Sequence, residues 1–333
     1  MFLHGIYNMK NFWEKLKNST QGGQAFYVLA PMAGITDSAF RQICKEFGAD
    51  VVYSEMASVT ALVYNPKPTL EMLEFSQKER PYVVQLFGSN PDHFAQAVKL
   101  VTKKIKPDGI DINFGCPVKK VAKQGAGAVL MNDFKLAHKI IETTIKNTNL
   151  PVSIKCRSKV GEVDVLKFLD SVRDLDIKAV MIHGRTLAQG HSGSVDFEII
   201  KKARNYFDGV IIANGGVKDC KSAEDLLGKT GADGIGIGQG ALGRPWIFKE
   251  FRISNPPAIA RHERAGYEFR IDDIKIIALK HAKLVYKLKG EQGVVEMRKH
   301  LCWYVSGLPN ASEIRRRLVK VKTVDEIQKI FNF

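Results

Sequence analysis

Cysteine is scarce in this sequence, and its spacing excludes two classes of protein. The five cysteines, at positions 44, 116, 156, 220 and 302, are scattered and odd in number, and no two are spaced as CxxC. This pattern indicates neither a zinc site nor a disulfide framework. Free thiols are typical of a reducing compartment. We therefore expect a cytoplasmic protein without a bound metal.

Long apolar runs are also missing. No run reaches the roughly 18 residues that a membrane-spanning helix needs, and the first ten residues, MFLHGIYNMK, have no signal-peptide core. We therefore expect no membrane-spanning helix. The sequence leaves open whether the chain starts at Met1 or at Met9, which directly precedes a helical pattern.

Acidic residues are too few to balance the basic ones. The chain has 50 Lys and Arg against 35 Asp and Glu, a formal charge of +15. Such a surplus favours a polyanionic partner, with nucleic acid as the first candidate and an anionic membrane surface as the second. A soluble protein that is merely basic remains open on charge alone.

What the sequence does contain is a repeat in which a short apolar run is followed by a helical pattern, often opened by an aspartate as N-cap. Such units imply parallel strands with right-handed crossovers. We predict an α/β fold, a (β/α)8 TIM barrel, with an open doubly wound sheet as the rival. The predicted strands are Tyr27–Pro31, Val51–Met56, Tyr82–Phe87, Gly109–Phe114, Val152–Cys156, Ala179–Gly184, Val210–Asn214 and Gly234–Gly238. The predicted helices include Asp37–Phe47, Pro91–Ile105, Asp133–Ile145, Asp164–Leu175, Asp196–Tyr206 and Asp219–Leu227.

The chain differs in character on both sides of this repeat. Residues 10–17 predict a short helix and residues 18–24 a polar linker, while ISNPPA at 253–258 predicts a second linker and the pattern from about Arg270 is helical. Residues 250–333 hold 17 Lys and Arg against 10 Asp and Glu, a surplus of 7. We predict an N-terminal extension (1–24), a catalytic barrel (25–252) and a basic helical domain (253–333).

The stretch Asp108–Met131, DGIDINFGCPVKKVAKQGAGAVLM, combines a short buried strand with a cysteine just past its end. In such barrels the active site lies at the carboxyl ends of the strands. Thiols are mostly protonated at neutral pH because their ordinary pKa is about 8.5, so Cys116 fits as a proton donor. From the spacing alone, a buried cysteine at a turn is equally consistent. Lys119, Lys120 and Lys123 either bind nucleic-acid phosphates or form a solvated loop.

The other strands also deliver polar or glycine residues at this end. Any one of them could be a satisfied rim residue, but the whole set indicates a site. Asn214–Gly216 and Gly234–Gly243 supply the bare backbone that binds phosphate in this fold. Gly238–Gly243 also matches the dinucleotide fingerprint GxGxxG, but no strand with an acidic residue follows, so we reject a Rossmann site. With Lys155 and Gln85 to bond the ring, the phosphate site suggests a flavin.

Together these motifs resemble the tRNA-dihydrouridine synthases. The C-terminal MRKHLCWYVSGLP is similar to the RNA-binding helical domain of that family, most nearly the bacterial B-type. The combination is specific, although each piece alone is not. The matching segments, from Leu29 to about Phe248, are LAPMAGITDSAFR, VQLFGSNPDHFAQA, DGIDINFGCPVKK, GAGAVLM, SIKCR, IHGRTLAQGHSG, ANGGV and GADGIGIGQGALGRPWIF.

The resemblance implies an enzyme that reduces the C5=C6 bond of uridines in the D-loop of tRNA, with FMN that NADPH re-reduces. Cys116 would give a proton to C5, while the flavin gives hydride to C6. Arg185, Lys119 and Lys120 are further candidates for substrate contact. The resemblance places Asn113 and Arg157 near the target base, Pro31, Met32 and Ala33 along the flavin, Gln85, Lys155 and His183 on its ring, and Asn214, Gly215, Gly216, Gly238 and Gln239 at its phosphate.

The chain departs from the family pattern at four positions. Gln239 and Leu187 stand where arginine is common, Gly216 where aspartate often stands, and Phe114 where methionine is usual. The Gln239 difference puts one phosphate contact in question and leaves the proton donor untouched.

Two other functions remain open. A barrel flavoprotein acting on a free pyrimidine, such as a dihydroorotate dehydrogenase, would share FMN and a nearby cysteine but would not need a basic helical domain. An RNA-binding protein built on an inactive barrel would not need Cys116, Lys155 and the glycine cradle. NADPH as reductant rests on the resemblance alone. We expect a monomer that binds tRNA and has no membrane partner.

Overall fold

The computed structural model describes residues 11–20, 25–254 and 270–332. The alternative starts at Met1 and Met9 and most of the predicted linker at 253–258 lie outside the described residues. The predicted domain boundaries stay predictions, although helix α11 (Ile247–Ser254) continues past residue 252.

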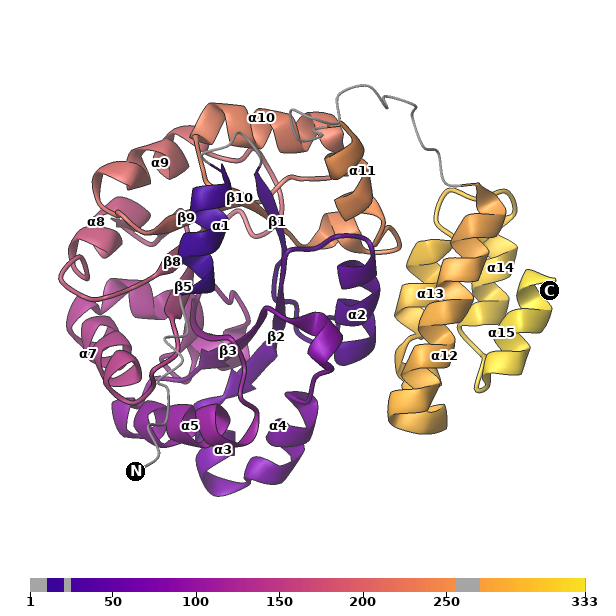
Figure 1. The fold of residues 1–333 in the computed structure, drawn as a ribbon, viewed down its shortest axis with the longest axis horizontal. Coiled ribbons are helices and arrows are strands. Elements are labelled where there is room, and N and C mark those ends of the chain that lie inside the picture. The colour runs from indigo at the N-terminus through magenta and orange to yellow at the C-terminus, as the bar shows by residue number, and fades with distance from the viewer. Residues whose placement is uncertain (1–10, 21–24, 255–269, 333) are drawn as a thin grey trace, which may run out of the picture.

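Eight parallel strands close into a barrel within the described residues (Figure 1). Each predicted strand is present, and the strands follow the order β1-β10-β9-β8-β5-β4-β3-β2 around the barrel. The predicted (β/α)8 barrel is confirmed, and the open sheet is excluded. The strands are β1 (Phe26–Leu29), β2 (Val51–Ser58), β3 (Tyr82–Phe87), β4 (Gly109–Phe114), β5 (Val152–Arg157), β8 (Ala179–His183), β9 (Val210–Asn214) and β10 (Gly234–Ile237).

Helices cover the outside of the barrel, and aspartate caps begin five of them. The side chains of Asp37, Asp133, Asp164, Asp196 and Asp219 each accept the N–H of the residue three positions on, which satisfies a donor that the helix cannot. The helix predicted to reach Leu175 ends at Asp170, where Ser171 Oγ donates to the Phe168 carbonyl. The outer helices are α2 (Ser38–Glu46), α5 (Pro91–Lys104), α7 (Phe134–Lys146), α8 (Val165–Asp170), α9 (Phe197–Lys202) and α10 (Cys220–Thr230).

Several short elements in the loops had no clear sequence signal. Two of them, β6 and β7, form a small antiparallel hairpin beside the barrel. These elements are α3 (Val59–Tyr64), α4 (Pro66–Met72), η1 (Gln77–Glu79), α6 (Lys119–Ala122), η2 (Gly127–Asn132), β6 (Lys159–Val160), β7 (Val163–Asp164), η3 (Ala203–Asn205) and η4 (Gln239–Ala241).

Helix α1 (Phe12–Thr20) lies against the strands at one end of the barrel (Figure 1). The predicted N-terminal helix is confirmed, but it includes residues 18–20, so the prediction of a linker there was wrong. Trp13 is fully buried with Phe26 and Tyr53, whose side chains fill the barrel interior. Its indole therefore closes the end of the barrel where the strands begin.

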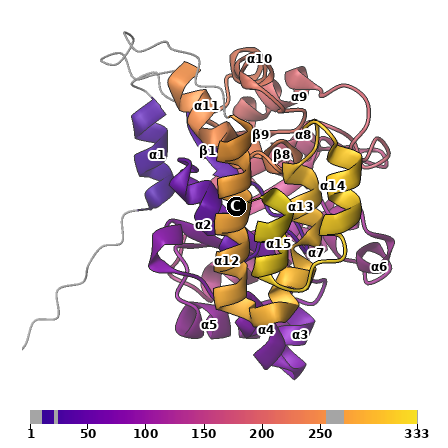
Figure 2. The same cartoon turned by 90° about the vertical axis from the view of Figure 1, so that its right-hand side faces the viewer.

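The C-terminal residues form a compact helical bundle with its own core beside α2 (Figure 2). Ala39 and Ile43 of α2 and Trp246 belong to this core, so the bundle is packed onto the barrel by apolar contact. None of the described helices is long and apolar enough to cross a membrane. The bundle consists of α12 (Ile271–Glu296, kinked at Gly290), α13 (Arg298–Tyr304), α14 (Ala311–Leu318) and α15 (Val324–Phe331).

A buried ion pair fixes the loop between β1 and α2. Arg41 Nε lies 2.5 Å from Glu79 Oε2, and both side chains are fully buried. The guanidinium also donates to the carbonyls of Thr36 (2.7 Å) and Glu74 (2.9 Å). Removing one partner of such a pair leaves an uncompensated charge in the interior.

We expect Glu79→Ala to lower the free energy of unfolding by about 3–5 kcal/mol, because Arg41 loses its counter-ion. Glu142→Ala is the matched control, since Glu142 pairs with Lys139 and Lys146 at the surface and its loss should cost less than about 1 kcal/mol. Urea denaturation measures both. Equal effects of the two substitutions would contradict the prediction.

Candidate active site

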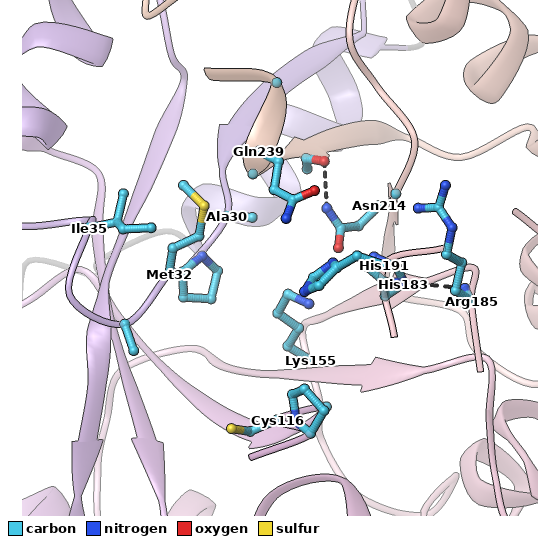
Figure 3. Close-up of a pocket in the computed structure, with 18 of the residues that line it drawn as sticks. Ala30, Met32, Ile35, Cys116, Lys155, His183, Arg185, His191, Asn214 and Gln239 are labelled. Carbon is cyan, nitrogen blue, oxygen red and sulfur yellow. Dashed lines mark hydrogen bonds between the residues drawn. The ribbon is translucent and has the colours of Figure 1, made fainter. Parts of the chain in front are cut away.

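A cavity of about 720 Å³ opens at the carboxyl ends of the barrel strands (Figure 3). This size is typical of a pocket for a cofactor-sized ligand. Every strand contributes to its wall: Ala30 follows β1, and the others supply Met56, Gln85, Asn113, Lys155, His183, Asn214 and Gly236.

The cavity brings together nearly all the predicted site residues. Lys119 and Lys120 are the exceptions, because they are exposed on α6 and do not line the wall. Those that line it are Pro31, Met32, Ala33, Gln85, Asn113, Cys116, Lys155, Arg157, His183, Arg185, Asn214, Gly215, Gly216, Gly238 and Gln239. Their roles stay predictions.

Unpaired backbone N–H groups lie at one end of the cavity, after β9 and β10. In the described part of the chain, the N–H groups of Gly215, Gly216, Gln239 and Gly240 donate to no protein acceptor. Gly216 has φ +75°, and a Cβ there would lie 3.2 Å from Val195. Asn214 Nδ2 donates to the Gly236 carbonyl (2.7 Å) and holds the two loops together. These donors form a cradle suited to an anion.

A chain of amide hydrogen bonds holds the cysteine at the opposite side. Asn113 Oδ1 accepts the backbone N–H groups of Gly115 (3.0 Å) and Cys116 (2.8 Å), while Asn113 Nδ2 donates to Gln85 Oε1 (2.8 Å). Cys116 is 8% exposed and lines the cavity. The thiol is therefore shielded from bulk water yet open to a bound ligand.

Two ionisable groups of the cavity, Lys155 and His183, have pKa values that are lowered by their surroundings. Burial and the neighbouring Arg157 lower the pKa of Lys155 to about 8. Burial, with Lys155 and Arg157 nearby, lowers the pKa of His183 to about 2, so this imidazole is neutral. Because His183 Nδ1 accepts the Arg185 N–H (3.2 Å), its proton is on Nε2 and is available as a donor.

The arginines mainly organise loops. Arg157 is 3% exposed and donates to the carbonyls of Gly115 (3.2 Å), Thr186 (3.3 Å) and Gly190 (2.5 Å). Arg185 Nε donates to the Gly193 carbonyl (2.8 Å). The Arg157 bonds tie the loop after β8 to the one that carries Cys116.

Sequence reasoning missed two residues that line the cavity and one buried carboxylate that bonds to a cavity residue. His191 lines the cavity and meets the His183 ring edge-on at 5.9 Å; it lies inside the GHSG motif, which was a usable signal. Asp111 shares the alternation of Asn113, which also could have revealed it. Trp303, on α13, lines the cavity from the bundle. A Cβ on Gly243 would come within 2.4 Å of the Trp303 backbone, so the last glycine of the GxGxxG match permits contact between bundle and barrel.

The fold and the site define a (β/α)8-barrel protein with a thiol, a lysine and an anion cradle around one cavity. No cluster of three or more potential metal ligands occurs among the described residues. Residues 28–332 match the family model described as dihydrouridine synthase, and the chain belongs to this family.

Relatives of similar length carry matching names. A probable tRNA-dihydrouridine synthase of Aquifex aeolicus is 32% identical over 305 residues, which cover 91% of this chain and 93% of that protein. One of Rickettsia bellii is 36% identical over 297 residues, covering 86% and 88%. Among solved structures, the old yellow enzyme homologue from Zymomonas mobilis has a TM-score of 0.52 at 13% identity and covers 71% of this chain and 90% of that chain, a likeness of fold alone.

We expect Lys155→Met to stabilise the ligand-free protein at pH 7 by on the order of 1–3 kcal/mol, because it removes a buried charge. The advantage should shrink above pH 8. There the folded chain loses the Lys155 proton, while the unfolded chain keeps it up to about pH 10.5, so wild-type stability rises. Urea denaturation of both proteins at pH 7 and pH 10 checks this. A difference that does not change between the two pH values would contradict the assigned cause.

Proposed function

We propose that this chain is a tRNA-dihydrouridine synthase, which reduces the C5=C6 bond of uridines in the D-loop with FMN as cofactor and NADPH as reductant. The observation that carries the proposal is the shared cavity, which Cys116, Lys155 and an anion cradle surround. Family membership supports the same reaction.

The residues present fit a flavin mononucleotide. The unpaired N–H groups of Gly215, Gly216, Gln239 and Gly240 would take the phosphate. When bound, the flavin supplies a hydride to the substrate. Gln85 and Lys155 would bond the polar edge of the ring, with Lys155 offsetting negative charge there, and His183 would donate from Nε2. Pro31, Met32 and Ala33 would pack along the ring.

Arg185 can supply the phosphate contact that Gln239 lacks in comparison with the arginine common in the family. Arg185 Nη2 lies 3.7 Å from the point that a Cβ would occupy if Gly216 had one. A positive charge therefore adjoins the cradle. We therefore assign Arg185 to the phosphate rather than to the base, in place of the arginine that the family commonly has at position 239.

Cys116 supplies the proton that completes the reduction at C5. Its backbone is held by Asn113 Oδ1, so the thiol stays at the cavity wall as the substrate enters. Asn113 and Arg157 border the same wall and would bind the target base. General acid catalysis of this kind is worth about 10²–10⁴-fold in rate.

The helical bundle would bind the rest of the tRNA. Trp303 lines the cavity from the bundle, and its aromatic ring would suit a base that has swung out of its stack. Lys119 and Lys120 are exposed on α6, directly after the cavity-lining Pro117 and Val118, and would be available to phosphates. These features favour an RNA substrate over a free pyrimidine such as orotate, which would need neither.

We expect Cys116→Ala to bind FMN and to be reduced by NADPH as in the wild type, but to form dihydrouridine at least about 100-fold more slowly, because the proton donor is missing. Cys220→Ala is the control, since Cys220 is a partly exposed cysteine on α10. Flavin absorbance, NADPH oxidation and dihydrouridine in tRNA are measured together. Near-normal product from Cys116→Ala would refute its role.

We expect Arg316→Ala with Arg317→Ala to weaken tRNA binding and to reduce its salt dependence by about one unit of slope for each phosphate that is no longer neutralised. Both arginines are exposed on α14. Lys201→Ala with Lys202→Ala is the matched control, because it removes the same charge from α9, across the barrel from the bundle (Figure 1). The dissociation constant for tRNA is measured for both double variants at several salt concentrations. Equal losses of affinity in the two would contradict the assignment of tRNA binding to the bundle.

A further inference from the structure

One carboxylate inside the barrel has no place in the reaction described so far. Asp111 on β4 is fully buried and does not line the cavity. Its Oδ1 accepts from Ser153 Oγ (2.6 Å) and its Oδ2 accepts from Gln85 Nε2 (2.7 Å). Both oxygens therefore accept hydrogen bonds, which is the pattern of an ionised carboxylate; burial raises the pKa of Asp111, but only to about 6.

The hydrogen bonds of Asp111 continue to the cysteine. Gln85 Nε2 donates to Asp111, Gln85 Oε1 accepts from Asn113 Nδ2 (2.8 Å), and Asn113 Oδ1 accepts from the N–H of Cys116 (2.8 Å). Two side-chain amides therefore connect a buried carboxylate with the backbone of the proton donor.

The chemistry of the two ends sets the direction of this chain. An ionised carboxylate can only accept, and a backbone N–H can only donate. A side-chain amide can be turned over with little change in shape, but between these two ends only one orientation of Gln85 and of Asn113 forms every bond. If position 111 offered a donor instead, both amides could turn over, and Asn113 would face the Gly115 and Cys116 N–H groups with its own N–H.

We propose that Asp111 is a positioning residue that sets the direction of the Gln85–Asn113 chain and so holds the backbone of Cys116 in place. The inference rests on the proposed role of Cys116. It also concerns Gln85, which lines the cavity. Since Asp111 takes one proton of the Gln85 amide, the other is left to face a bound ring as a donor.

The neighbouring serine provides a matched control. Ser153 bonds the same carboxylate and is 1% exposed, yet it is not part of the amide chain. Ser153→Ala removes a hydrogen bond from Asp111 without changing its ability to accept. A merely structural role for the buried carboxylate would make Ser153→Ala and Asp111→Asn similar in effect.

A compensating pair of substitutions tests direction itself. Asp111→Asn replaces a group that can only accept by one of the same shape that can also donate, so position 111 no longer imposes a direction. Adding Gln85→Glu moves the carboxylate one step along the chain, where it accepts from the new amide at position 111 and from Asn113, so Asn113 again turns its oxygen to Cys116. The double variant keeps the net charge and the volume of the wild type but offers no N–H from position 85 to the cavity.

The experiment measures amide hydrogen exchange of the Gly115–Cys116 segment in the full-length protein, with and without FMN. We expect Asp111→Asn to exchange about tenfold faster there, as for the loss of a buried hydrogen bond, while Ser153→Ala stays within about threefold of the wild type. The double variant should recover protection of the segment but not FMN affinity. Activity should show a lower kcat for Asp111→Asn with the KM for tRNA unchanged.

Unchanged exchange in a folded Asp111→Asn protein would overturn the proposal, as would a double variant that exchanges as fast as Asp111→Asn. If Asp111→Asn does not fold, the double variant decides, because restored direction predicts a folded and protected protein, and an unfolded double variant counts against it. The hydrogen-exchange measurement needs no tRNA and tests the role of Asp111 by itself. A wild-type protein that is inactive on tRNA would overturn only the proposed function.

Discussion

The register between β3, β4 and β5 is the constraint on which the site depends. Gln85, Asp111 and Ser153 are successive cross-strand partners, so their side chains meet at one height inside the barrel. Because side chains alternate along a strand, a slip of one residue in β4 would turn Asp111 and Asn113 outward and bring isoleucines in their place. The placement of the thiol, the amides and the lysine thus follows from one pairing of backbones.

Much of this arrangement is readable in the sequence because it depends on local pattern. The eight strands, the aspartate caps and the order of polar residues at the strand ends are properties of short segments. A closed barrel then brings those ends together without further information. Even the missed Asp111 follows the same period of two as Asn113.

The features of the fold and the site that were not predicted depend on contacts between distant segments, which no local pattern encodes. The Trp303 backbone packs on Gly243, and Arg157 donates to carbonyls of two different loops. The early end of α8 coincides with a hydrogen bond from the Ser171 hydroxyl to the Phe168 carbonyl. Cap and loop hydrogen bonds of this kind compete closely with continued helix, so the sequence leaves the outcome open.

The position of Trp13 has a consequence for how molecules enter and leave the cavity. Because Trp13 fills the end of the barrel where the strands begin, a molecule would reach the cavity from the opposite end, within the part of the chain that is described. A molecule that binds in the cavity would leave through the same opening. In the proposed reaction, the reductant and the RNA would therefore share one entrance, each leaving before the other enters.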